Sequence, residues 1–435
     1  MTLNKQKGIR GLLIRIKQQN LELSRENILQ NLAYLWSGTF LAQILMAINA
    51  IILARYLGPQ NFGIYTGTYA AVGLTSFFLN WGLDTWLLRE SSISKESFRL
   101  LGRVFFIKIA FAIPWGITLF LVLPTIRSGF FLESLTLIVI FDIFFDGLFN
   151  AELAAMNAQK RVPVVSGLLF LSRGSRLLIT ILLIVLGMNS PEIFAAGRMM
   201  GTILALVAAL ILFAPKIYGV ELHEAKVTFR QAIPYGFSEL LAIVYMQADV
   251  TLIALLIGTG EAVGLYAPAS GLINALFVIP LAGFYVLVPV LTRLHQERSS
   301  SFKHTIIQVF VGFSILGIIL TFFMWAAGPL LSDLLLGSTY GTTGQLLRIL
   351  SPILFLKSIS FACAAFLVAV GWQVRRLIPQ AISASVNIIL NLMVIMTLGI
   401  LGVALVYVVS EVILLIGYLW ISARWFRVKP GQMEV

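Results

Sequence analysis

Long apolar segments alternate with short polar connectors along nearly the whole chain. Most segments reach about 20 residues, the length at which an α-helix crosses a bilayer. Single-residue alternation of apolar and polar positions, the pattern of a membrane barrel, is absent. The sequence therefore predicts an all-α polytopic membrane protein with about twelve transmembrane helices. To within a few residues these span 31–54, 64–83, 104–124, 130–154, 163–186, 191–214, 232–257, 264–289, 305–327, 343–370, 377–398 and 401–422.

One short pattern occurs twice, about half a chain apart. Residues 57–65 read L-G-P-Q-N-F-G-I-Y, and residues 257–266 read I-G-T-G-E-A-V-G-L-Y. Both copies follow a span running in the same direction. The repeat thus predicts two parallel, pseudo-symmetric six-helix bundles around a central cavity. We expect a basic N-terminal segment, a first bundle, a cytoplasmic linker, a second bundle and a C-terminal tail, at 1–30, 31–214, 215–231, 232–422 and 423–435.

The N-terminal segment carries several cations and is not a cleavable signal, because the apolar run after it is too long and lacks a cleavage site. Its apolar residues share one helical face, which predicts an amphipathic helix at 9–28 lying on the membrane surface.

Composition and charge agree with a multi-pass membrane protein. Hydrophobic residues make up 59% of the 435 residues and charged residues 11%, with a net charge of +12. Of the 31 lysines and arginines, 23 lie in connectors on the side of the N-terminus, six inside spans, and two, Arg55 and Arg127, on the other side. The positive-inside rule then places both termini in the cytoplasm, with the chain in the cytoplasmic (inner) membrane. The asymmetry also explains the basic charge without nucleic acid as a partner.

Several kinds of chemistry lack their motifs. The chain has no phosphate-binding loop of the G-x-x-x-x-G-K-[ST] type, no H-E-x-x-H and no serine–histidine–aspartate arrangement. Cys363 is the one cysteine and has no partner for a metal or a disulfide. We therefore expect no catalytic residue, metal or cofactor, and a protein that is not an enzyme.

Two charged stripes lie in neighbouring spans. Asp142, Asp146 and Asn150 fall at i, i+4 and i+8 in the fourth span, and Arg173 with Arg176 at i and i+3 in the fifth. Equal distances from the intervening turn predict Asp146 level with Arg173, and Asp142 level with Arg176. Two interpretations are open, a pair of structural ion pairs or the wall of a polar cavity, and they are compatible.

Further cations inside spans suggest a substrate site. Arg198 lies near the depth of Arg176, while Lys357 and Arg348 belong to the second half. Cations from both halves, converging on one cleft, would suit a diphosphate, whose oxygens accept paired donors. The alternative is that each cation pairs with its own carboxylate. We take Arg176, Arg198 and Lys357 as substrate-binding candidates, with Arg173 and Arg348 as lesser ones.

Other ionisable groups in spans carry weaker signals. Asp249 and Glu239, in the seventh span, are candidates for coupling to a proton or a sodium ion, and hydrogen bonding to neighbouring hydroxyls is the alternative. Glu411 has no evident partner. We expect Lys108, close to a span end, to extend its amine to the interface.

Five tryptophans near span ends are expected to anchor the chain at the membrane interface, namely Trp81, Trp86, Trp115, Trp372 and Trp420.

These motifs resemble a family. Asn27, Asn31-x-x-Tyr34 and A-R-Y-L-G-P-Q-N-F-G-I-Y at 54–65 are similar to the start of oligosaccharide (O-antigen type) flippases, in the superfamily that includes multidrug exporters and lipid II flippases. Q-A-D-V at 247–250, V-G-L-Y-A-P at 263–268, P-V-L at 289–291 and A-V-G-W-Q-V-R-R at 369–376 extend the resemblance over nearly the whole chain.

The resemblance implies two six-helix bundles around a V-shaped cavity and alternating access that carries a lipid-linked oligosaccharide to the outer leaflet. Its implied partners are that polyprenyl-diphosphate substrate, membrane lipids and other polysaccharide-assembly proteins. The alternatives are a cation-coupled multidrug exporter of the same superfamily, disfavoured by the many intramembrane cations, and a membrane-embedded glycan-assembly enzyme, disfavoured by the short outer connectors.

The topology can be tested directly. Reporter fusions after Gly187, Gly258 and Gly399 should all report an external position, because the charge asymmetry requires an even number of spans with both termini inside. An internal position at any of the three would contradict the predicted topology.

Overall fold

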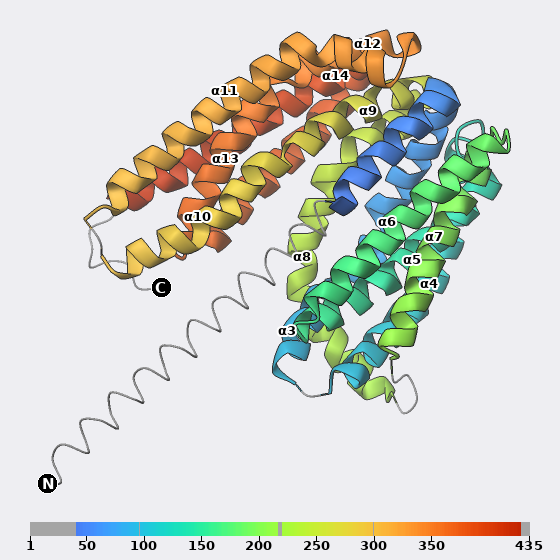
Figure 1. Cartoon of the computed structure of the whole chain (residues 1–435), viewed down its shortest axis with the longest axis horizontal. Coiled ribbons are helices and arrows are strands. Elements are labelled where there is room, and N and C mark those ends of the chain that lie inside the picture. Colours follow the sequence, from blue (N-terminus) through green and yellow to red (C-terminus); the bar gives the residue numbers. More distant parts are fainter. Residues whose placement is uncertain (1–40, 95, 216–219, 299, 428–435) are drawn as a thin grey trace, which may run out of the picture.

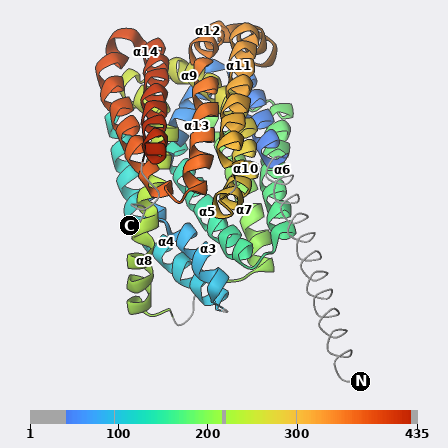
Figure 2. The same cartoon turned by 90° about the vertical axis from the view of Figure 1, so that its left-hand side faces the viewer.

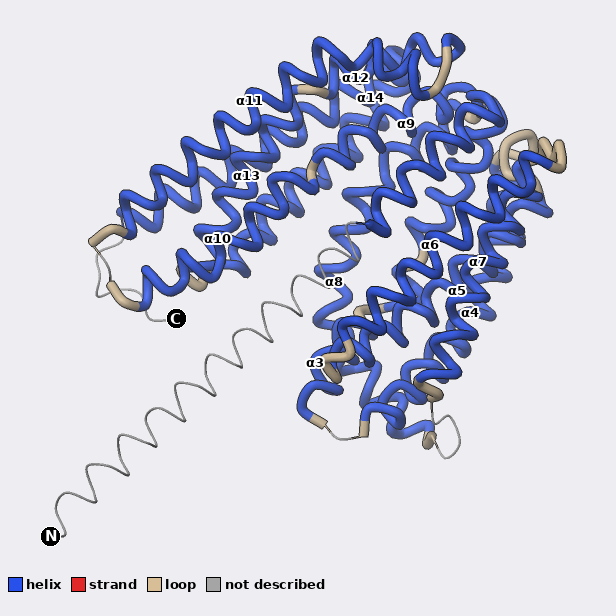
Figure 3. The backbone as a smooth tube through the Cα atoms, viewed as in Figure 1, coloured by secondary structure: helices blue, strands red, loops and turns tan. Residues whose placement is uncertain are grey.

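The computed structural model describes residues 41–94, 96–215, 220–298 and 300–427, so the amphipathic helix predicted at 9–28 lies outside the described residues. The described part is almost entirely helical and contains no strand (Figure 3). A helix at Leu41–Thr75 is followed by α2 (Phe77–Asn80), α3 (Leu83–Ile93), α4 (Ser97–Ile126), α5 (Glu133–Ala158), α6 (Val162–Val185), α7 (Pro191–Leu212) and α8 (Leu222–Leu252). After a π-helical turn, η1 (Ile253–Ile257), come α9 (Gly260–Leu276), α10 (Val278–Gln296), α11 (Phe302–Leu335), η2 (Ser338–Tyr340), α12 (Gly341–Leu350), α13 (Pro352–Ala369), η3 (Gln373–Arg376) and α14 (Leu377–Arg427).

The helices form two lobes in a V (Figure 1). The first lobe contains the helix at Leu41–Thr75 and α2–α7, and the second contains α9–α14. Helix α8 packs against α3 and α4 of the first lobe and against α14 of the second. It begins at Leu222, inside the predicted linker at 215–231, so the connection between the lobes is itself partly helical.

The number of membrane crossings agrees with the sequence. In the described residues, ten helices are long and apolar enough to span a bilayer. Two of them change direction at a glycine with positive φ, Gly58 at 70° and Gly399 at 57°, a backbone conformation that ends a right-handed helix. Counting both arms of each gives the twelve predicted spans, and the all-α fold in two bundles is confirmed.

Small residues set the packing inside the first lobe. Helix α7 lies against both α5 and α6, whereas α5 and α6 touch each other little. Gly197 and Gly201 are four residues apart on α7, and a Cβ atom on Gly201 would lie 3.0 Å from the backbone nitrogen of Arg176. Such glycine pairs let helices approach closely in a membrane. The approach brings Arg176 of α6 beside α7.

The lobes meet at one end of the V, here called the apex, through the two copies of the sequence repeat. A Cβ atom on Gly63 would lie 1.7 Å from the carbonyl oxygen of Gly260, and one on Gly264 would lie 1.8 Å from that of Pro59. The Gln60 side chain also accepts a 2.8 Å hydrogen bond from the Glu261 backbone N–H. Both copies therefore lie at the same end of the molecule, as parallel but not inverted repeats require.

Two arginines fasten the apex further. Arg127, after α4, donates to the carbonyl oxygens of Leu255 and Leu256 at 3.1 and 2.7 Å, and so caps the end of η1. Arg55 donates to the carbonyl oxygen of Leu334 near the end of α11 at 3.2 Å. The last carbonyl groups of a helix have no hydrogen-bond partner within that helix. In both cases an arginine of the first lobe supplies the missing donor, to η1 for Arg127 and to α11 for Arg55. These are the same two cations that the charge pattern assigns to the outer side.

The lobes diverge at the opposite end, here called the open end (Figure 1). The connectors between α3 and α4 and between α10 and α11 lie there, and arginines such as Arg99 and Arg293 are next to them. Arg99 and Arg103 there each lie 2.9 Å from Glu224 at the start of α8. Arg99 is 46% exposed, so its ion pair contributes little to stability, whereas Arg103 and Glu224 are 19% and 22% exposed. The direct backbone contacts between the two lobes, Gly63 with Gly260 and Gly264 with Pro59, lie at the apex.

The apex contact should be sensitive to a single methyl group. Gly264→Ala places a methyl group on the Pro59 carbonyl, and overpacking of this kind costs about 1–3 kcal/mol. We expect the fraction of molecules with an opened apex to rise about tenfold. Labelling of a cysteine introduced at Gln60 measures this in detergent, since Cys363 is buried. Gly271→Ala on the same helix is the control, because nothing lies within 4 Å of its added Cβ. Equal labelling in both variants would contradict the prediction.

Candidate functional site

The first lobe contains a buried polar cluster around Asp142 of α5. Its side chain is fully buried, and one carboxylate oxygen lies 3.0 Å from Nε of Arg198 on α7. The same oxygen accepts a 2.9 Å hydrogen bond from the Tyr69 hydroxyl, and the other accepts one from Thr202. A buried charge is tolerated only when it is paired and hydrogen-bonded in this way.

Arg198 is the member of this ion pair that is partly exposed at the surface of the lobe. Its guanidinium carbon lies 3.9 Å from the ring centre of Tyr69, a cation–π contact. The Tyr69 ring in turn lies 4.8 Å from that of Tyr65. The Arg198 side chain is nevertheless 30% exposed. It can therefore present part of its guanidinium edge to a ligand while keeping its ion pair.

A second ion pair lies one helical turn away. Arg176 of α6 is 2.6 Å from Asp146 of α5, and the same nitrogen donates to the Thr202 hydroxyl at 2.7 Å. Asn150 donates to the other oxygen of Asp146 at 3.2 Å. Thr202 therefore links the two pairs, because it accepts from Arg176 and donates to Asp142.

The predicted partners in these pairs are wrong, although all four residues are close together. Asp146 pairs with Arg176 and not with Arg173, and Asp142 pairs with Arg198 and not with Arg176. The prediction assumed that α5 and α6, consecutive in sequence, form a tight hairpin. In the structure α7 is the main neighbour of both, so an α7 arginine takes Asp142 and Arg176 reaches Asp146.

Arg173 makes no ion pair or hydrogen bond with any described residue, yet it lies within electrostatic range of Arg176, Asp146 and Arg198. Its side chain is half-buried. The cluster thus combines three arginines with two aspartates. Within this cluster, one arginine therefore has no aspartate to balance its charge.

The second lobe has its own charged pair. Lys357 of α13 lies 2.9 Å from Glu411 of α14, which is fully buried. The ammonium also donates to the Tyr245 hydroxyl of α8. Glu411, for which the sequence indicated no partner, is therefore the counter-ion of a predicted site residue. The Lys357 side chain is 12% exposed, less than Arg198.

Arg348 has different surroundings. It is exposed on α12, donates to the Trp325 carbonyl oxygen at 3.3 Å, and lies 5.7 Å from the centre of the Trp325 ring. These contacts are with α11 of its own lobe. No contact relates Arg348 to the first-lobe cluster, and we leave it out of the site.

The acids of α8 differ in their partners. Asp249 accepts hydrogen bonds from the Tyr266 hydroxyl and the Asn391 amide, both at 2.9 Å, and pairs with no described cation. Glu239 accepts from Asn80 and from the backbone N–H of Gly82 at 3.1 Å, which ties α8 to the turn between α2 and α3. Glu239 is thus a structural contact between helices, whereas Asp249 is a carboxylate held by neutral groups.

Lys108 does not extend to the interface as predicted. Its side chain is fully buried, 2.7 Å from Asp84 of α3 and 2.7 Å from the Gly147 carbonyl oxygen of α5. A partner carboxylate in the neighbouring helix stabilises the ammonium inside the lobe, so it has no need to reach water.

Sequence analysis missed the neutral members of these clusters. Tyr69, Thr202, Tyr245 and Asn391 all bond to predicted charges. Thr202 could have been found, because it follows Arg198 by four residues and so shares its helical face. Tyr245 and Asn391 reach their partners across other helices, and no spacing in the sequence indicates that.

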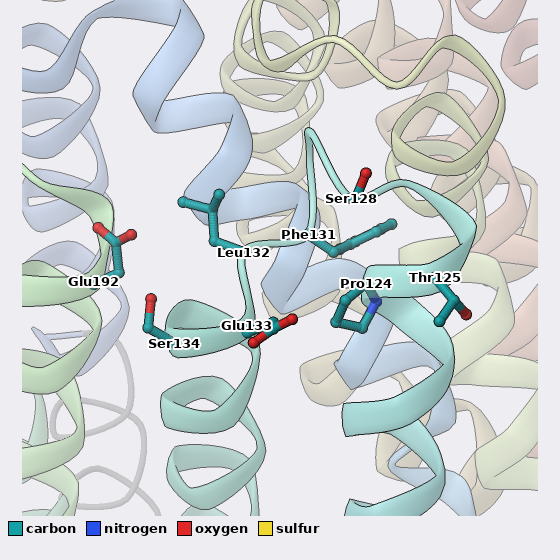
Figure 4. A pocket seen from close by; sticks show the side chains of 8 residues that line it. All are labelled: Pro124, Thr125, Ser128, Phe131, Leu132, Glu133, Ser134 and Glu192. Carbon is teal, nitrogen blue, oxygen red and sulfur yellow. The ribbon is translucent and has the colours of Figure 1, made fainter.

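A separate cavity in the first lobe lies away from these clusters. It has a volume of about 740 Å³ and lies at the apex end of the first lobe, between the end of α4 and the starts of α5 and α7 (Figure 4). Glu133 and Glu192 line it, together with Ser128 and Ser134. It contains none of the predicted site residues, and its carboxylates would repel an anion.

The pairing can be tested by stability. Arg198→Ala leaves buried Asp142 without its counter-ion, which should cost about 3–5 kcal/mol of unfolding free energy. Arg173→Ala breaks no ion pair and should change it by only about 0.5 kcal/mol. Denaturant unfolding of the purified protein measures both. Adding Asp142→Asn to Arg198→Ala should recover part of the loss. Equal losses from the two single alanine variants would contradict the observed pairing.

The structure matches a lipid II flippase, MurJ, in an inward closed conformation, with a TM-score of 0.73 and 16% identity over 89% of this chain and 87% of that one. It also matches a multidrug resistance MATE transporter of the MOP superfamily in its inward-facing conformation, with a TM-score of 0.69 and 17% identity over 90% and 96% of the two chains. An outward-facing structure of a MATE family transporter matches with a TM-score of 0.59 and 16% identity, over 92% of this chain and 97% of that one.

At such identities these matches establish the fold alone. No curated protein sequence matches the chain. The family model for polysaccharide biosynthesis proteins matches residues 28–295, more than half of the chain. The chain therefore belongs to the polysaccharide biosynthesis protein family, with the fold of flippases and transporters of the MOP superfamily.

Proposed function

We propose that the protein moves a polyprenyl-diphosphate oligosaccharide across the cytoplasmic membrane by alternating access, for assembly of a polysaccharide. The family and the fold support a flippase or transporter of this superfamily. The nature of the cargo rests on the charges inside the lobes. Its head group cannot cross hydrocarbon, whereas its tail can remain there, so a polar path open sideways to lipid suits it.

The excess positive charge of the cluster around Asp142 and Asp146 is the observation that carries the proposal. Three arginines face two aspartates there, and Arg173 has no ion pair among the described residues. A fixed excess cation inside a membrane protein favours an anionic ligand. Guanidinium groups bind phosphate oxygens in pairs. Arg173 and the exposed edge of Arg198 are accordingly the proposed diphosphate contacts, and Arg176 holds the cluster together.

Lys357 is the proposed contact from the second lobe. It is balanced by Glu411 and hydrogen-bonded to Tyr245, so its charge is only partly available. Affinity from that side is then modest, which suits a carrier that must release its cargo. Binding that is equally tight in every state would hinder turnover.

The shape supports a state that faces the cytoplasm. The lobes are joined at the apex and diverge at the basic open end (Figure 1). The structure is also more similar to the inward-facing than to the outward-facing MATE transporter, with TM-scores of 0.69 and 0.59. With the basic end in the cytoplasm, as the positive-inside rule requires, the open side receives the lipid-linked substrate where it is made.

Asp249 is the proposed site of ion coupling. It is a carboxylate within the membrane whose described partners, Tyr266 and Asn391, are neutral. Its charge is therefore free to be balanced by a proton or a sodium ion, in contrast to Asp142, Asp146 and Glu411, which have cations beside them. Glu239 has no such role in this proposal because its hydrogen bonds join two helices.

The rival functions fit the charges less well. A multidrug exporter for cationic compounds would need a site with excess negative charge, and the first-lobe cluster has the opposite sign. A glycan-assembly enzyme would need room for a sugar site outside the membrane, and the connectors at the apex are short.

Surface-glycan export in cells that depend on this protein tests the proposal. Arg173→Ala should reduce export by at least about tenfold, since a phosphate loses charge-assisted hydrogen bonds worth about 1.5–3 kcal/mol each. Arg173→Lys should retain part of it, because the charge remains but the paired donors are lost. Export is measured at matched protein levels in the membrane.

Arg230→Ala, an exposed arginine near the start of α8, is the matched control and should export normally. Normal export by Arg173→Ala and Lys357→Ala alike would overturn the proposed substrate contacts. Loss of drug resistance with intact glycan export would favour the exporter instead.

A further inference from the structure

A groove lies on the flank of the second lobe, between the two arms of α14 and the short helix η3. Its volume is about 550 Å³. Five isoleucines line it, among them Ile382 and Ile416, together with Arg375, Arg424, Trp372 and Trp420. Figure 2 shows α14 at the front of the second lobe, near the described C-terminal end. The groove shares no residue with the charged clusters described above.

The two arginines of the groove have no acid partner among the described residues. Arg375 stacks on Trp372, with its guanidinium carbon 3.8 Å from the ring centre, and Arg424 lies 5.6 Å from the ring centre of Trp420. Both arginines are exposed. Stacking leaves the edge of a guanidinium, with its N–H donors, free to bind an anion. Arg293, by comparison, is 2.7 Å from Glu297.

The rest of the groove is apolar and faces outward. Ile378 and Ile416 are 65% and 60% exposed, which in a membrane-spanning helix means contact with lipid. The floor is formed where the two arms of α14 touch, because a Cβ atom on Gly417 would lie 2.6 Å from Cβ of Pro379. This close approach leaves a furrow and not a ridge between the arms. The furrow continues from the paired cations into the apolar part of the helices.

We infer that this groove binds an anionic phospholipid, with the phosphate between Arg375 and Arg424 and an acyl chain along the isoleucines. The two arginines supply charge complementarity for a phosphate, and the tryptophans are the residue type that lies at the headgroup level. Basic pockets between helices at the membrane surface bind anionic head groups. A free phosphate would use only the mouth of the groove, whereas a phospholipid accounts for its apolar length as well.

Native mass spectrometry of the full-length protein, released from detergent with added lipid, tests this. Phosphatidylglycerol should bind at least about tenfold more tightly than phosphatidylethanolamine with the same acyl chains, because it alone carries a net negative charge for the two arginines. Arg375→Gln combined with Arg424→Gln should remove that preference. Ile382→Trp, which fills the groove and keeps both arginines, should also weaken phosphatidylglycerol binding.

The control is Arg230→Gln combined with Arg427→Gln, which removes the same charge from exposed positions outside the groove. It should keep the lipid preference, and its loss in the control would overturn the inference in favour of general surface charge. Unchanged binding in Ile382→Trp would also overturn it, as would competition by inorganic phosphate at equal concentration. Tighter binding of polyprenyl phosphate than of phosphatidylglycerol would identify a different lipid and likewise overturn it.

Discussion

The arrangement of the two lobes depends on a contact between bare backbones. At the apex, the helix turns after Gly58 and Gly258 bring Gly63 and Gly264 against the main-chain oxygens of the opposite copy. A side chain at Gly63 or Gly264 would clash with the opposite backbone, so the distance between the two segments is set by main-chain contact. Within hydrocarbon there is little hydrophobic force to bring helices together, and close packing of small residues takes its place. Helix α8 adds a second connection, because it packs against α3 and α4 of the first lobe and against α14 of the second.

The same scarcity of hydrophobic driving force explains why the buried charges matter. The clusters around Asp142 and Glu411 each join helices that are far apart in sequence, and each includes a residue with a partly exposed edge. Charges of this kind are expensive in a membrane unless they are neutralised. In these two clusters each carboxylate has a cation beside it, and Arg173 is the arginine that forms no ion pair with a described residue. The proposed diphosphate contact rests on that residue.

Sequence patterns were sufficient for the fold because apolar length, charge asymmetry and an internal repeat are all local or cumulative signals. They placed Gly58 and Gly258 in equivalent turns, and both have φ of 70°. They could not decide which arginine Asp142 meets, because that depends on α7 lying against both α5 and α6. Lys108 shows the same limit, since its proximity to a span end suggested water whereas Asp84 of another helix neutralises it. Depth in the membrane is encoded along the chain, but the neighbours of a helix are not.

The arginines of the apex have partners of an unusual kind. Arg55 and Arg127 bind main-chain carbonyl oxygens, and every amino acid supplies that oxygen. Substitution of Leu255, Leu256 or Leu334 therefore does not remove the acceptor. A substitution of Arg55 or Arg127 alone can therefore remove these hydrogen bonds, and no second substitution is needed to restore the acceptor. Asp142 and Arg198 differ in this respect, because both partners are side chains and a change in either one removes the ion pair.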